Sequence, residues 1–140
     1  MEKSVLLEKI EALNVKESWK EKFRLYAEAG LTSGGFFPKF ENKNVLKGKF
    51  GATFNIFSVL FGPFYYISLG LYKKAGMIFI FFGIARFLTN IIGDNLGMMS
   101  PSIVLLAFVI FYIYFIFFYF PTMVNYDYYR KQVLGENFWW

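Results

Sequence analysis

Cysteine and histidine are both absent from the sequence. Without thiols the chain cannot form disulfides, bind metal through thiolate or use a cysteine nucleophile. Without imidazole it lacks the commonest general base and metal ligand. Carboxylates are scarce too: seven of the ten lie within residues 1–41. We therefore expect a protein that is not an enzyme and holds no metal or cofactor.

Charge is also in short supply. Charged residues make up 18% of the chain and hydrophobic residues 56%, whereas charge accounts for about a quarter of a globular protein. The apolar residues gather in three blocks, at 54–72, 75–92 and 101–124. Roughly 20 helical residues span the hydrocarbon core of a bilayer, and the last block reaches this length. The sequence therefore predicts an all-α membrane protein.

The first apolar block is interrupted at its middle by Gly62-Pro63. Proline has no N–H, and its ring opposes a continuous helix. Each half could form a helix of about 12–13 Å, near half the thickness of the hydrocarbon core. We predict a re-entrant or interfacial hairpin that enters and leaves the membrane on one side. A single proline-kinked spanning helix is the alternative.

The distribution of basic residues favours the hairpin. Of the fifteen Lys and Arg residues, ten lie within 1–50, two at 73–74 and two at 130–131, whereas 93–100 contains none. Basic segments mark the cytoplasmic side of a membrane. With a hairpin followed by two spans, all three basic segments lie on that side. We therefore predict that both termini are cytoplasmic.

Three regions follow from this pattern. They are a cytosolic N-terminal region at 1–50, a membrane domain at 51–124 and a cytosolic interfacial segment at 125–140. Apolar residues at helical spacing predict a helical hairpin in the first region, whose second helix is capped by Ser18 and ended by Gly30. A basic loop then leads to the membrane domain.

Lysines border the membrane domain on its predicted cytoplasmic side. Basic residues beside a membrane attract anionic lipid headgroups. We therefore expect membrane lipids, rather than nucleic acid, as partners. The lysines predicted to contact headgroups are Lys47, Lys49, Lys73 and Lys74.

Two motifs flank the membrane spans. The first contains Asn55, Gly62-Pro63-Phe64-Tyr65 and Tyr72-Lys73-Lys74-Ala75-Gly76. The second contains Asn125, Tyr128, Tyr129 and Arg130. In this combination the chain resembles a bacterial family of small inner-membrane proteins that is catalogued as a domain of unknown function. The resemblance covers roughly residues 18–130. It implies a location in the bacterial inner membrane and supplies no activity.

Polar residues of both motifs fall at the predicted cytoplasmic boundary. These residues are Asn55, Asn125, Tyr128, Tyr129 and Arg130. We predict that they meet and clamp the hairpin to the end of the last helix. A lipid-headgroup or partner site at the same place is the alternative.

Arg86 lies inside the second apolar block, where a charge costs at least about 2.5–3.5 kcal/mol in a bilayer. At about 100° per residue, Gly76, Gly83 and Asn90 fall on one side of the helix, and Arg86 lies within about 60° of Gly83. Glycines allow another helix to approach closely. We predict that this side packs against the third block or the hairpin. Arg86 would then tether helices, either through backbone carbonyls of the hairpin turn or by snorkelling toward Asp94. A substrate, ion or headgroup contact is the alternative.

These features together predict an accessory or scaffold protein that acts by helix–helix association. It would form a homo-oligomer or join a larger membrane-protein complex through Gly76 and Gly83. One alternative is an oligomeric passage for a small solute or ion, lined by the broken hairpin. The other is a factor that binds anionic lipids.

Overall fold

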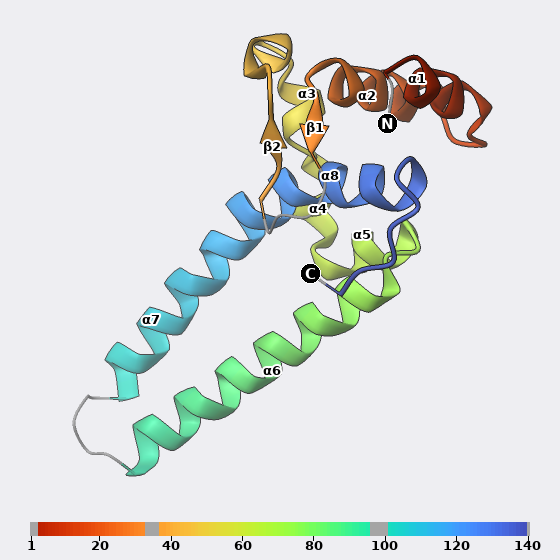
Figure 1. Cartoon of the computed structure of the whole chain (residues 1–140). Coiled ribbons are helices and arrows are strands. Elements are labelled where there is room, and N and C mark those ends of the chain that lie inside the picture. The colour runs from red at the N-terminus through yellow and green to blue at the C-terminus, as the bar shows by residue number, and fades with distance from the viewer. Residues whose placement is uncertain (1–2, 33–36, 96–100, 140) are drawn as a thin grey trace. The chain divides into compact units, whose positions relative to one another are not determined.

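The computed structural model describes residues 3–32, 37–95 and 101–139 (Figure 1). The chain divides into two compact units. The terminal unit contains Met1–Ile56 and Pro121–Phe138, and the apolar unit contains Phe57–Phe120 and Trp139–Trp140. This division differs from the predicted boundaries at residues 50 and 124, because the chain after residue 120 shares a core with the N-terminal helices.

Two helices, α1 (Lys3–Ala12) and α2 (Glu17–Glu28), form the hairpin that the sequence predicts (Figure 1). Arg24 joins them, because its guanidinium donates hydrogen bonds of 2.6 and 2.9 Å to the Glu11 carboxylate. The hydrogen bond from Arg24 lowers the pKa of Glu11. The predicted cap at Ser18 is wrong, because Ser18 lies inside α2.

The described residues after α2 form short secondary-structure elements where the sequence predicts a loop. Gly30 ends the helix with a φ of 66°. The chain then forms antiparallel strands β1 (Leu31–Thr32) and β2 (Lys39–Phe40), the 3-10 turn η1 (Lys43–Leu46) and helix α3 (Phe50–Thr53). Elements this short show no hydrophobic period, which is why sequence patterning misses them.

Helix α8 (Phe120–Gln132) supplies much of the core of the terminal unit. Its Tyr128 ring packs on Phe23 of α2, with ring centroids 5.7 Å apart. Helix α8 continues to Gln132, past residue 124, where the third apolar block was predicted to end. Pro121 lies in the first turn of α8, directly after the π-helical segment Phe115–Tyr119, so the proline does not end the helix. Residues 125–130, predicted to be interfacial, are buried.

The apolar unit begins with the predicted broken hairpin. Helix α4 (Ile56–Phe61) stops at Gly62, and α5 (Pro63–Ser68) starts directly after it. Gly62 has a φ of 49° and a ψ of −131°, a conformation that side-chain-bearing residues rarely adopt. The break at the glycine–proline pair is therefore confirmed. The second half ends at Ser68, four residues earlier than predicted.

Two long helices follow and lie side by side (Figure 1). These are α6 (Tyr72–Asn95) and α7 (Pro101–Tyr114), and a π-helical turn, η2 (Phe115–Tyr119), extends α7. By length and composition, Tyr72–Ile91 and Leu106–Gln132 could each cross a membrane. Because α6 starts three residues before the predicted position, the basic pair at 73–74 belongs to its first turn rather than to a joint between helices.

Candidate functional site

One side of α6 carries polar and small residues that face away from the rest of the apolar unit. Gly83, Arg86 and Asn90 are exposed, and Gly76 is half-buried. A Cβ atom built at Gly76 or Gly83 meets no atom within 4 Å. We call Gly83, Arg86 and Asn90 the glycine–arginine face. It has room for a close neighbour that the described residues do not provide.

The predicted packing of this side against the third block or the hairpin is therefore wrong for the described chain. Aromatic rings on another side of α6 make the contact with α7. Phe81 lies 5.6 Å from Phe111, and Phe82 lies 5.2 Å from Tyr112, measured between ring centroids. Large rings bury more area than glycine and favour edge-to-face pairs, so they determine which side of α6 turns inward.

Polar groups on α6 differ in whether the helix satisfies them. The Thr89 hydroxyl donates a 2.7 Å hydrogen bond to the Ala85 carbonyl one turn earlier. Such a bond lets a hydroxyl sit in an apolar helix. By contrast, the Arg86 side chain makes no ion pair or hydrogen bond to any residue that the structure describes. Asp94, its predicted snorkelling partner, lies beyond the described side chains.

A buried amide pair lies in the terminal unit. The Asn55 amide donates to the Asn125 side-chain oxygen over 2.9 Å, and the Asn55 main-chain N–H donates to the Pro121 carbonyl over 2.9 Å. The Asn125 amide donates to the Ala52 carbonyl, also over 2.9 Å. These two of the predicted clamp residues therefore meet, 70 positions apart in sequence.

Short helix α3 explains why this pair is needed. The last carbonyls of a helix have no partner within it. Ala52 lies in the last turn of α3, and its carbonyl accepts hydrogen bonds from Asn125 and from the Tyr26 hydroxyl, the latter at 2.5 Å. Two donors from α2 and α8 thus fix the end of α3. Sequence reasoning missed Tyr26, whose place on the apolar side of its helix suggested packing alone.

Asp127 is a second buried polar residue that sequence reasoning missed. It is fully buried in α8, two positions after Asn125. Burial raises the pKa of the Tyr26 phenol, and the negative charge of Asp127 raises it further. Tyr26 therefore stays neutral and keeps its donor proton far above neutral pH. The one available signal was a carboxylate placed between tyrosines in the second motif.

The other predicted clamp residues occupy different surroundings. Tyr128 packs edge-on against Trp19 at 4.6 Å, and Tyr129 packs against Phe23 at 5.6 Å. Arg130 pairs with Glu136 over 2.6 Å and lies 4.0 Å from the centre of the Phe138 ring. Arg130 therefore holds the chain that follows α8. Its partner lies beyond a turn at Gly135, where φ is 71°, and helical spacing could not identify it.

The lysines predicted to bind headgroups fall into two groups. Lys47 and Lys49 are exposed. Lys74 is buried at 4% exposure, with its ammonium 6.0 Å from the centre of the Tyr119 ring. Lys73 is half-buried, with its ammonium 5.2 Å from the centre of the Trp139 ring. The structure therefore corrects the prediction for Lys74, which has no surface to offer a headgroup.

Comparisons with family models, with curated proteins and with solved structures find no match to this chain. The resemblance to a bacterial inner-membrane family therefore stays a prediction that rests on the two motifs alone.

Proposed function

We propose that this protein is a scaffold or accessory protein of the bacterial inner membrane, which associates through α6 with a second copy or with another membrane protein. The observation that supports it is the exposed glycine–arginine face on a helix long and apolar enough to span a bilayer. The role needs no catalytic or cofactor chemistry.

The free-energy cost of a charge in lipid favours association through this face. Arg86 lies about 21 Å from the start of α6 and about 14 Å from its end, at 1.5 Å per residue. A charge at such a depth costs at least about 2.5–3.5 kcal/mol when it faces lipid. A second helix that carries carbonyl, amide or carboxylate oxygens would remove this cost. Gly83 supplies the close approach that brings those groups within reach.

A photo-crosslinking experiment in membranes tests the proposal. A photoreactive phenylalanine analogue replaces Phe87, which lies about 40° from Gly83 around α6, or Leu88, about 140° away. Both side chains are exposed, at 63% and 50%. We expect an adduct from position 87 and little from position 88. An adduct of twice the 16.4 kDa chain mass identifies a second copy, and any other mass identifies another protein.

A second experiment adds the substitution Arg86→Leu to the chain that carries the photoreactive analogue at position 87. It removes the polar contact while it keeps an insertable helix, so the adduct should weaken severalfold. Equal adducts from positions 87 and 88, or none from either, would contradict the proposal. Either outcome is expected if the Arg86 side chain instead snorkels to the membrane surface and needs no partner helix.

The alternative of an oligomeric passage depends on the same association, because one copy offers two long apolar helices among the described residues. A dimeric adduct would be compatible with either a scaffold or a passage. The size of the assembly in mild detergent separates them, because a passage lined by hairpins needs a ring of several copies.

A further inference from the structure

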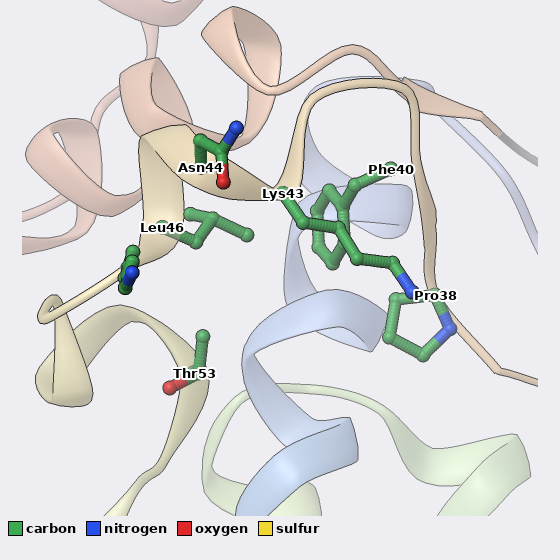
Figure 2. Close-up of a pocket in the computed structure, with 7 residues that line it drawn as sticks. Pro38, Phe40, Lys43, Asn44, Leu46 and Thr53 are labelled. Atoms are coloured by element: carbon green, nitrogen blue, oxygen red, sulfur yellow. The ribbon is translucent and has the colours of Figure 1, made fainter.

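A surface hollow in the terminal unit is not used by the helix association. It lies where β2, η1 and α3 come together, and its volume is about 570 Å³ (Figure 2). Pockets that hold small ligands have volumes of roughly 300–1,000 Å³. The residues that give this hollow its character are Phe40, Lys43, Asn44, Leu46 and Lys47.

The hollow carries positive charge that nearby acidic groups do not neutralise. Lys43 and Lys47 are exposed, and neither forms an ion pair within the described parts of the chain. The stretch from residue 39 to 49 holds four lysines and one carboxylate, Glu41. The Glu41 side chain packs toward Gly30, within 3.1 Å of where a Cβ on that glycine would lie. The lining of the hollow therefore includes two exposed ammonium groups that form no ion pair with the described residues.

Hydrogen-bonding groups in the hollow also favour an anion. The Asn44 side-chain amide contributes two N–H donors, and it has no hydrogen-bond partner in the described residues. The Asn44 main-chain N–H is already used, because it donates to the Asn42 side chain over 3.2 Å. Two ammonium groups and an amide match the several acceptor oxygens of a phosphate.

Apolar surface beside these donors distinguishes an amphiphile from a small soluble anion. Leu46 is buried and Phe40 half-buried at the wall of the hollow. Phe37 and Phe50, which flank the lining segment in sequence, are 55% and 69% exposed. Exposed aromatic rings next to lysines are typical of residues at a membrane–water interface.

We infer that this hollow binds the headgroup of an anionic phospholipid, with Lys43, Lys47 and Asn44 around the phosphate and Phe40 and Leu46 beside the glycerol carbons. The inference rests on the membrane location in the proposed function and not on association through α6. It extends the sequence prediction, which named Lys47 but neither Lys43 nor a site.

Binding of short-chain phosphatidylglycerol to the full-length chain in an uncharged detergent tests this inference. The test variant is Lys43→Gln with Lys47→Gln. The matched control is Lys9→Gln with Lys16→Gln, which removes the same charge from exposed lysines outside the hollow. We expect the test variant to bind about 30-fold more weakly, from the usual contribution of two lysines at an anionic surface, and the control to change less than about threefold.

Phosphatidylcholine and glycerol 3-phosphate identify what the hollow recognises. Both should bind the unmodified chain at least about tenfold more weakly than phosphatidylglycerol, because one lacks net charge and the other lacks acyl carbons. Equal losses in the test and control variants would overturn the site. Equal affinity for glycerol 3-phosphate would overturn the lipid assignment in favour of a free phosphate ester. These outcomes do not depend on crosslinking through α6, so the two proposals can fail separately.

Discussion

At the scale of single residues, the terminal unit is held by a few buried polar contacts among many aromatic ones. Asn55 and Asn125 are buried at 4% and 0% exposure. The two side chains bond to each other, and Asn125 also donates to the carbonyl at the end of α3. A buried polar group that loses its partner costs about 1–3 kcal/mol. Stability should therefore depend strongly on these two amides.

We predict that Asn125→Ala lowers the free energy of unfolding by about 1–3 kcal/mol, because Asn55 and the Ala52 carbonyl lose hydrogen bonds. Asn55→Ala should have a similar effect, and the double variant should cost less than the sum because the two residues contact each other. Denaturant unfolding of the full chain in detergent measures all three. Asn14→Ala, at an exposed position, is the control and should stay within about 0.5 kcal/mol. If the double variant loses the full sum of the two single losses, the Asn55 and Asn125 side chains do not stabilise each other.

At the scale of elements, the sequence predicts those elements that are long enough to show a hydrophobic pattern or that contain a residue that breaks a helix. The helices of the N-terminal hairpin and the long α6 and α7 have clear hydrophobic patterns, and the break at Gly62-Pro63 follows from proline chemistry. The short strands β1 and β2 have no such pattern. The Asn55–Asn125 contact was predictable as a meeting of motifs, but its third member, Tyr26, depends on tertiary packing that no local pattern encodes.

The side of α6 that turns inward could not be predicted for a related reason. Periodicity places Gly76, Gly83 and Arg86 near one another on the helix. Which side meets α7 depends on competition between that surface and the aromatic surface around Phe81 and Phe82. Which side of α6 turns inward is decided by both helices together, so the residue pattern of α6 alone does not predict it.

Conformation at Gly62 gives a prediction for the hairpin. Its φ of 49° with a ψ of −131° is strained for any residue with a Cβ, although a Cβ there would meet no atom within 4 Å. Gly62→Ala should therefore destabilise the chain by about 1–3 kcal/mol through backbone strain alone. Gly51→Ala is the matched control, because Gly51 lies in helix α3 and also has open space. It should be neutral or stabilise by up to about 1 kcal/mol.

Thermal unfolding of both glycine variants in detergent measures this difference. A Gly62→Ala protein as stable as the Gly51→Ala protein would show that the backbone relaxes at the break. The chain would then not depend on glycine to separate α4 from α5.

At the scale of the whole molecule, the distribution of basic residues and the broken hairpin lead to one membrane arrangement. We propose that α4 and α5 enter and leave on the cytoplasmic side, and that two spans follow. The alternative, three spans, would place the start of α6 on the periplasmic side. A chain without native thiols suits cysteine labelling, because each introduced cysteine is the sole reactive site.

Labelling with a membrane-impermeant maleimide distinguishes the two arrangements. Tyr72→Cys reports on the start of α6, because Tyr72 is 68% exposed whereas the neighbouring Lys74 is buried. We expect Tyr72→Cys to label only after the inner membrane is opened, because the rule that basic segments stay inside places residues 73–74 in the cytoplasm. Asn95→Cys, at the other end of α6, should label from the periplasmic side. Glu8→Cys, on the exposed side of α1, is the cytoplasmic control. Labelling of position 72 from outside, with position 8 still protected, would replace the hairpin by a span and move the C-terminus to the periplasm.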